Sequence, residues 1–348
     1  MVSERFKNLK AYPVFSLALF GSLGLIILFL FSMGHGAYHL DLSRVLGITL
    51  NKLLGNPTFP QDINAEVVLF KLRLPRIILA ILVGGALASA GAAYQCLFRN
   101  PMVAPDILGV SSGAGVGASL AIMWGLSSIA IELFAFAGGL IAVLLVMGVT
   151  RSLGPNRSLV TMILVGVVVS SLFAAFGSLI KYLSASTDNL ANLVLWLMGS
   201  FAHAGDISGV GVLFFCSVLG VGTLVISGWS LNTLSFGEEE ALAMGVDVFR
   251  LRILVIFAST LLTASSVALC GLIGWVGLIV PHLVRFLVGP NFTVLLPLSY
   301  LIGALFTLCA DILVRLLLPG EMPVGIVTSI IGAPLFIYIL WRSHSAWH

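Results

Sequence analysis

The chain has 348 residues, of which 59% are hydrophobic and only 9% are charged, and its formal net charge is +3. A soluble domain carries about 25% charged residues, so this composition excludes a water-soluble enzyme. It predicts an all-α polytopic membrane protein, and the weak positive charge gives no indication of a nucleic-acid partner.

Ten apolar stretches follow one another along the chain, and most approach the length of about 20 residues that a helix needs to cross the hydrocarbon core of a bilayer. We predict membrane helices at residues 12–33, 77–97, 108–124, 128–149, 158–182, 207–227, 251–271, 273–288, 294–314 and 324–341. The stretches do not alternate apolar and polar residues, which excludes a transmembrane β-barrel. Residues 1–348 are therefore predicted to form a single transmembrane domain.

An even number of spans places both termini on the same side of the membrane. The basic residues Arg5, Lys7 and Lys10 precede the first span and favour a cytoplasmic location for both ends. Residues 34–76 are then an extracytoplasmic loop, in which residues 41–54 have the spacing of an amphipathic helix at the interface. Residues 228–252 become a cytoplasmic loop.

Within that cytoplasmic loop, three consecutive acids are followed by a short apolar segment. Acidic residues suit the start of a helix, where the backbone N–H groups are unpaired. The segment therefore favours a short amphipathic helix for docking to another protein, and a solvated connecting turn is the alternative. The residues concerned are Glu238, Glu239, Glu240, Ala241, Leu242, Met244, Gly245 and Val246.

Glycine and alanine are dense at residues 84–93 and 109–117, which predicts close packing between membrane helices. The glycines at 113–117 lack the Lys-Ser/Thr pair of a phosphate-binding loop. The four cysteines have no metal-ligand spacing. We expect them to be free, buried thiols and predict no metal site.

Several segments occur in an order that points to a known family. In the first half of the chain they are Leu-Arg-Leu-Pro-Arg at 72–76, the small residues 84–91, and the motifs at 95–101, 104–106 and 108–115. In the second half they are Trp-Leu-Met-Gly-Ser at 196–200, the loop 241–246, the Gly-rich segment 271–285 with its Pro-His pair, and the motifs between 310 and 334. Together they resemble the FecCD-type permeases of type II ABC importers, which serve ferric siderophores, haem and vitamin B12. Residues 1–70 match only in hydropathy.

The resemblance implies a fold like that of the vitamin B12 importer permease, with ten membrane helices in a bacterial or archaeal cytoplasmic (inner) membrane. It implies a second permease copy, in a homodimer or a closely related heterodimer. Two ABC ATPase subunits and an extracytoplasmic solute-binding protein complete the expected assembly. This chain is expected to bind no cofactor and to be no enzyme by itself, because ATP and Mg belong to the ATPase subunits.

The resemblance also assigns roles to particular residues. Arg73, Arg76 and Arg315 are expected to face outward and receive acidic residues of the binding protein, with lipid-headgroup positioning as the alternative. Asp311 lies one helical turn from Arg315, so an ion pair that orients the arginine is expected. Residues 238–246 are expected to be the coupling helix that contacts the ATPase.

The fifth span is expected to line the translocation path. Its small residues, Ser170, Ser171, Ala174 and Ser178, suit a wall that binds a large chelate weakly. Leu159 and Val160 near its inner end are the candidate gate, and ordinary helix packing is the alternative for each.

The favoured function is the transmembrane subunit of an ATP-driven importer for a metal chelate, with a ferric siderophore ahead of haem and cobalamin. A secondary transporter driven by an ion gradient is the alternative. That class usually has acids or histidines along a midplane path, whereas the ionisable residues of this chain cluster at span ends. The sequence does not identify the substrate.

Overall fold

The computed structural model describes residues 2–36, 38, 40–54, 63–154, 159–185, 189–202, 207–317 and 322–344. Within these ranges every regular element is a helix. In chain order they are α1 (Val2–Gly34), α2 (Leu42–Leu54), α3 (Ile63–Val67), the π-helix η1 (Val68–Arg73), α4 (Leu74–Leu97), the 3-10 helix η2 (Pro105–Leu108), α5 (Val110–Met123), α6 (Ser128–Ser152), α7 (Leu159–Leu183), α8 (Asn189–Leu197), α9 (Ile207–Ile226), α10 (Gly228–Leu234), α11 (Glu238–Ala243), α12 (Val248–Cys270), α13 (Val276–Val288), α14 (Phe292–Leu317) and α15 (Val324–His344).

Each predicted span contains one apolar helix. In the described part of the chain, seven helical stretches are long and apolar enough to cross a membrane: α1, the continuous helix 63–97, α6, α7, α9, α12 and α14. The shorter apolar helices α5, α13 and α15 occupy the other three predicted positions. The all-α polytopic architecture is thereby confirmed.

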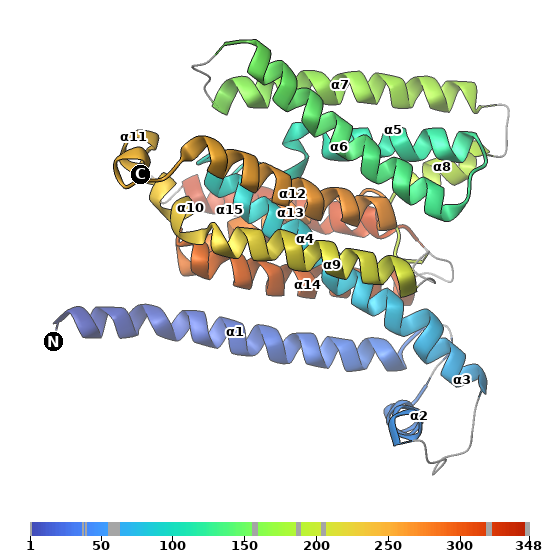
Figure 1. The fold of residues 1–348 in the computed structure, drawn as a ribbon. Coiled ribbons are helices and arrows are strands. Elements are labelled where there is room, and N and C mark those ends of the chain that lie inside the picture. The colour runs from blue at the N-terminus through green and yellow to red at the C-terminus, as the bar shows by residue number, and fades with distance from the viewer. Residues whose placement is uncertain are drawn as a thin grey trace.

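Helix α4 forms the centre of the bundle, and most of its side chains are buried. It packs against α12, α13 and α14, whereas α1 and α7 lie at opposite edges (Figure 1). Glycines allow these contacts. A Cβ atom at Gly84 would overlap the carbonyl group of Gly303, and a Cβ atom at Gly91 would overlap that of Gly277. The predicted packing through small residues is confirmed here, because backbone meets backbone directly.

The outer loop differs from the prediction. Helical structure begins at Ile63 and runs without a break to Leu97, where the sequence predicted a loop up to residue 76. Pro75 cannot donate a backbone hydrogen bond, and the π-helical turn before it adapts the register: the N–H of Leu74 bonds to the carbonyl of Leu69, five residues back. The predicted interfacial helix is present as α2, and residues 55–62 lie outside the described residues.

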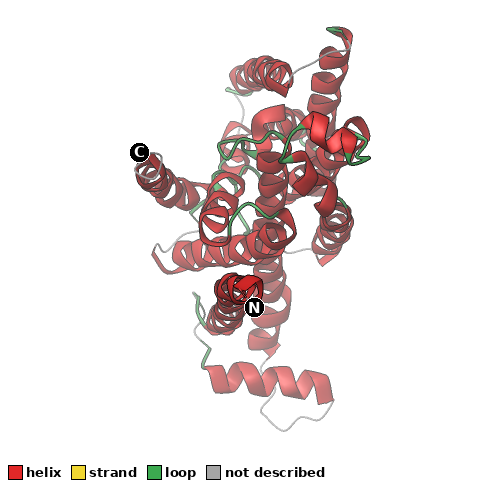
Figure 2. Cartoon of the chain, turned by 90° about the vertical axis from the view of Figure 1, so that its left-hand side faces the viewer, coloured by secondary structure: helices red, strands yellow, loops and turns green. Residues whose placement is uncertain are grey.

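The start of α1, the end of α15 and the short helix α11 lie at one end of the bundle, while α2 and α3 lie at the other (Figure 1). Viewed along the bundle, the N and C markers both stand at the near end (Figure 2). The even number of spans is consistent with this arrangement. We refer to these ends as the α11 end and the α2 end.

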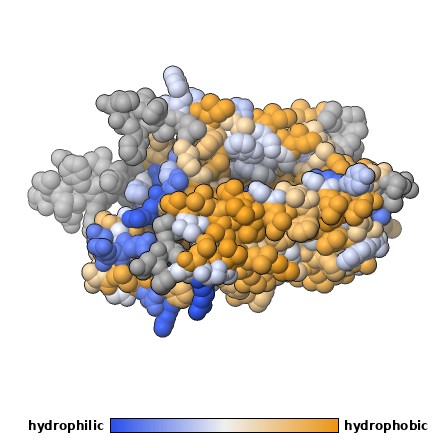
Figure 3. All heavy atoms as spheres, turned by 90° about the horizontal axis from the view of Figure 1, so that it is seen from above, coloured by the Kyte–Doolittle hydropathy of each residue, from blue (hydrophilic) through white to orange (hydrophobic). Residues whose placement is uncertain are grey.

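The surface has the polarity expected of a protein in lipid. Hydrophobic residues cover the middle of the face shown in Figure 3, and hydrophilic residues gather toward one end. Of the four cysteines, Cys96, Cys216 and Cys270 are buried as predicted, but Cys309 is exposed on α14. A thiol behaves as a small apolar group, so it is compatible with an exposed position on an apolar helix as well as with the core.

Candidate functional site

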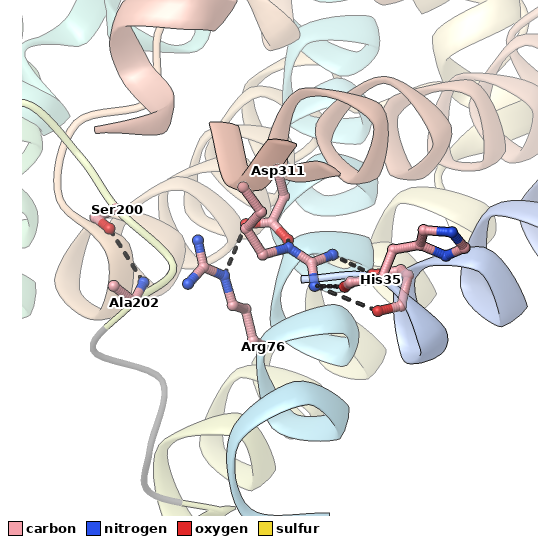
Figure 4. A network of polar contacts seen from close by, with 7 residues as sticks. His35, Arg76, Ser200, Ala202 and Asp311 are labelled. Carbon is pink, nitrogen blue, oxygen red and sulfur yellow. Dashed lines mark hydrogen bonds and ion pairs between the residues drawn. The ribbon is translucent and has the colours of Figure 1, made fainter. Parts of the chain in front are cut away.

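A cluster of charged residues joins three helices at the α2 end. Arg76, in the first turn of α4, places its Nε atom 2.8 Å from Oδ1 of Asp311 on α14 (Figure 4). The second carboxylate oxygen of Asp311 lies 3.0 Å from Nε of Arg315, one helical turn further on. The expected ion pair between Asp311 and Arg315 is therefore confirmed. Because Asp311 is fully buried, its charge depends on these two guanidinium groups.

The same cluster binds the end of α1. Arg73 donates hydrogen bonds to the carbonyl oxygens of Met33 and Tyr38. Nη1 of Arg315 lies 3.3 Å from each of the carbonyl oxygens of Ser32 and His35, and Nη2 of Arg315 donates a hydrogen bond to the Ser32 hydroxyl. The last carbonyls of a helix have no partner within the helix and carry partial negative charge. The arginines therefore close the end of α1 and fix it against α4 and α14.

The sequence led us to expect Arg73 and Arg76 to point outward, and the structure corrects this orientation. Arg73 and Arg76 are only 6% and 8% exposed. Both side chains turn inward because the buried carboxylate of Asp311 and the carbonyls at the end of α1 attract them. The sequence could not reveal this, since the partners lie 40 residues away for Met33 and 235 for Asp311.

Three of the family motifs meet in a backbone crossing close to this cluster. The N–H of Ser200 bonds to the carbonyl of Cys270 at 2.7 Å, and the N–H of Gly325 lies 3.4 Å from the carbonyl of Gly199. Gly199 and Gly271 have φ angles of +71° and +69°, which side-chain-bearing residues rarely adopt. A Cβ atom on Gly271 would also overlap the carbonyl oxygen of Trp196. The glycines of these motifs thus serve a close approach of three chain segments.

The short helix α8 precedes this crossing and was not predicted. Its nine residues, Asn189–Leu197, lie between the fifth and sixth predicted spans. Leu193 is fully buried in it, and the Asn189 side chain lies 3.4 Å from the carbonyl oxygen of Met123 at the end of α5. The helical spacing of Leu190, Leu193 and Leu197 is the signal that could have identified it.

The short helix predicted within residues 238–246 is present as α11 at the opposite end. Ala241 and Val246 are buried against the bundle, whereas Leu242 and Met244 are 59% and 52% exposed. The helix covers only Glu238–Ala243, because Gly245 adopts a φ of +82° and turns the chain toward α12. The helix was predicted to extend to Val246, so its last three residues are corrected to a turn.

Two ion pairs hold this segment to α12. Glu238 pairs with Arg252, and Asp247 pairs with Arg250 at 2.9 Å. Asp247 also accepts a hydrogen bond of 3.0 Å from the backbone N–H of Arg250, which caps the first turn of α12. The acidic side chains Glu239 and Glu240 are exposed beside the apolar pair. The segment therefore presents a mixed apolar and acidic surface.

Helix α7 exposes one face along its length. Ser171, Ala174 and Ser178 are exposed on it, and Ser170 is half-buried. The hydroxyls of Ser171 and Ser178 bond to the carbonyls of Val167 and Ala174 in their own helix, at 2.9 Å and 3.0 Å. Because these hydroxyls are already satisfied, the face offers few groups that could hold a solute.

The two candidate gate residues have different surroundings. Val160 is 61% exposed, on the open side of α7. Leu159 is half-buried and lines a pocket with residues of α6 and α12. The structure therefore does not bring the two side chains together on one surface.

The bundle of long apolar helices defines a polytopic α-helical membrane protein. Residues 24–342 match the model of the FecCD transport family. The chain belongs to this family and is an ABC transporter permease of the FecCD type.

Similar proteins cover nearly the whole chain. The molybdate import system permease protein MolB of Haemophilus influenzae is 40% identical over 93% of this chain and 95% of its own length. The vitamin B12 import system permease protein BtuC of Vibrio cholerae is 37% identical over 87% of this chain and 91% of its own length. A solved structure described as an inward-facing conformation of a metal-chelate type ABC transporter has a TM-score of 0.83 and 39% identity, and the match covers 94% of this chain and 98% of that one.

Proposed function

We propose that this chain is the transmembrane subunit of an ATP-driven importer that moves a metal chelate across the cytoplasmic membrane of a bacterium or archaeon. A ferric siderophore is the first candidate, followed by haem and cobalamin. The observation that carries the proposal is the position of α11 and the turn after it: they present Leu242 and Met244 at the end of the bundle, where a separate ATPase can bind. The membership of the FecCD family supports the same role.

In this proposal α11 transmits motion from the ATPase. Two exposed apolar side chains give the contact its buried area, and the neighbouring acids fix its orientation. The ion pair between Glu238 and Arg252 joins α11 to α12, a helix that packs against α4, α5, α6 and α9. A movement of α11 would therefore reach the core of the bundle, and two permease copies would alternate between discrete arrangements.

The exposed face of α7 is the proposed wall of the path between two copies of the chain. A large solute passes easily where no strong site holds it, and the satisfied hydroxyls of Ser171 and Ser178 provide such a wall. Val160 is the proposed gate residue on this exposed face. Leu159 lines the pocket between α6, α7 and α12, and its proposed role is to support the gate from that side.

The charged cluster at the α2 end is the proposed attachment point of the binding protein. Among the described contacts of the cluster, three arginines (Arg73, Arg76 and Arg315) accompany the carboxylate of Asp311. An acidic group of a partner protein would be drawn to these positive charges. Because the arginines already bond inward, docking has to exchange contacts at the end of α1.

Reconstitution tests the overall proposal. The chain is placed in liposomes with an ABC ATPase and a solute-binding protein of the same importer, and uptake of radioactive ferric siderophore and of radioactive molybdate is measured. We expect uptake only with ATP and all partners present. Uphill uptake by the chain alone under an ion gradient would establish a secondary transporter instead.

The same system decides the substrate. The similarity to a molybdate permease adds an oxyanion such as molybdate to these candidates. Uptake of molybdate but not of the iron chelate would replace the siderophore assignment while leaving the ATP-driven mechanism in place. Cobalamin and haem are measured in the same way.

Replacement of Arg73 by Gln tests the docking role, and Lys71→Gln is the matched control because Lys71 is exposed in the same π-helix. We expect weaker binding of the binding protein in the Arg73 variant only. A lower melting temperature without any change in binding would reduce Arg73 to a structural role.

A further inference from the structure

A pocket of about 390 Å³ opens between α6, α7 and α12 at the α11 end of the bundle. Its walls are mostly apolar and include Leu144, Met147, Phe249 and Ile253. Three residues with hydrogen-bond donors also line it: Thr150 and Arg151 from the last turn of α6, and Arg252 from the first turns of α12. No acidic residue lines it among the described residues.

Two of these donors are buried without a partner. The Thr150 hydroxyl and the Nε atom of Arg252 form no hydrogen bond with any described residue. Thr150 is only 8% exposed, so its hydroxyl is buried in the present side-chain arrangement. A buried polar group without a partner is costly and calls for an explanation. Thr150 and Arg252 both line the same pocket, so a small rotation of each side chain would bring its unpaired donor to an acceptor bound there.

The order of residues along the helices sets the polarity of the pocket. On α6, Leu144 and Met147 precede Thr150 and Arg151 at the helix end. On α12, which starts at the same end of the bundle, Arg252 precedes Ile253 and Ile256 (Figure 1). The donors therefore lie toward the α11 end, and the apolar walls extend toward the middle of the bundle. A phospholipid has the same gradient, with a phosphate above its acyl chains.

We propose that this pocket binds an anionic phospholipid of the membrane leaflet at the α11 end. The phosphate oxygens accept from Arg151, Arg252 and Thr150, and an acyl chain lies against Leu144 and Phe249. Basic pockets between membrane helices are suited to anionic headgroups. Leu144 and Phe249 are 57% and 63% exposed, so the apolar wall is open to a chain arriving from the bilayer.

The site adjoins the surface proposed for the ATPase, although its existence does not rest on that role. Arg252 pairs with Glu238 at the start of α11 through Nη2, which leaves Nε for the lipid. The same side chain thus contacts α11 and lines the pocket. Occupation of the pocket would hold Arg252 in place and thereby fix α11.

Native mass spectrometry of the delipidated full chain tests the proposal. The protein is titrated with phosphatidylglycerol and with phosphatidylcholine of the same acyl chains. We expect a preference of about tenfold or more for the anionic lipid and a loss of about fivefold in Arg151→Gln or Arg252→Gln. Equal binding of the two lipids by the wild-type chain would overturn the proposal.

Two further variants separate the pocket from general charge effects. Arg250→Gln removes a charge from the same segment, but Arg250 is exposed, pairs with Asp247 and does not line the pocket. We expect it to bind lipid as the wild type does, and a loss equal to that of Arg252→Gln would overturn the proposal. Thr150→Val removes one orphan donor and should reduce binding without changing any charge.

Gly148→Leu keeps all three donors and fills the pocket instead. Gly148 lines the pocket, and a Cβ atom built there meets no heavy atom within 4 Å, so the variant should fold. We expect it to lose the preference for the anionic lipid, and unchanged binding would overturn the site. Equal affinity for glycerophosphate and phosphatidylglycerol would show a small-anion site without a lipid and would overturn it as well.

Discussion

Nε of Arg76 lies 2.8 Å from Oδ1 of Asp311, and this contact joins the first turn of α4 to the last third of α14 across 235 residues of sequence. Asp311 holds Arg315 with its other oxygen, and Arg315 holds the end of α1. One buried carboxylate therefore organises the α2 end of three helices. Its position explains why the arginines turn inward in this conformation.

Replacement of Asp311 by Asn should destabilise the protein strongly. Removing one partner of a buried ion pair leaves uncompensated charge and costs about 3–5 kcal/mol. Here two arginines lose the Asp311 carboxylate as a partner. We expect a markedly lower melting temperature of the detergent-solubilised chain. The control is Glu66→Gln, because the pair of Glu66 with Lys52 is about half exposed and should contribute less than about 1 kcal/mol.

Replacement of Gly91 by Ala should disturb the contact between α4 and α13. The added Cβ atom would overlap the backbone carbonyl of Gly277, which cannot move as a side chain can. Overpacking of this kind costs about 1–3 kcal/mol or more. Gly222→Ala in α9 is the matched control, since a Cβ atom there meets nothing within 4 Å. Equal melting temperatures of the two variants would contradict the close packing described here.

Replacement of Leu242 or Met244 by Glu should weaken attachment of the proposed ATPase. Both side chains are more than half exposed on the α11 segment, so the bundle itself should tolerate the change. Loss of an apolar contact at the centre of an interface reduces affinity by about tenfold to a hundredfold. Co-purification of the ATPase measures the effect. Leu126→Glu, at the opposite end of the bundle, is the control, and the ATPase should copurify with this variant as it does with the wild type.

Cysteines placed on the exposed face of α7 should react with a water-soluble thiol reagent. The experiment begins from a Cys309→Ser chain, because Cys309 is the exposed native thiol among the four. Ser171→Cys and Ser178→Cys are expected to be labelled in the membrane, since this face is proposed to line an aqueous path. Val212→Cys on α9 is 60% exposed in the single chain but should face lipid. Labelling of Val212→Cys alone would assign the path to another helix.

The sequence predicted those features that depend on neighbouring residues. Hydropathy located all ten apolar helices, because each span requires its own continuous run of apolar residues. The spacing of Asp311 and Arg315 predicted their ion pair, since both lie on one helix one turn apart. The three acids before Ala241 located α11 for the same local reason. The order of the motifs indicated the family.

Only the tertiary structure decided how these pieces meet. It showed that Arg73 and Arg76 are buried, and that the side chains of Leu159 and Val160 lie on different sides of α7. It also showed that the segments with Trp196, Gly271 and Gly325 cross one another. These relationships depend on which helices lie side by side, and that choice is made by shape and by the pairing of buried charges over long sequence separations. The sequence contains the residues that make such contacts, but it does not show which of them lie close together in space.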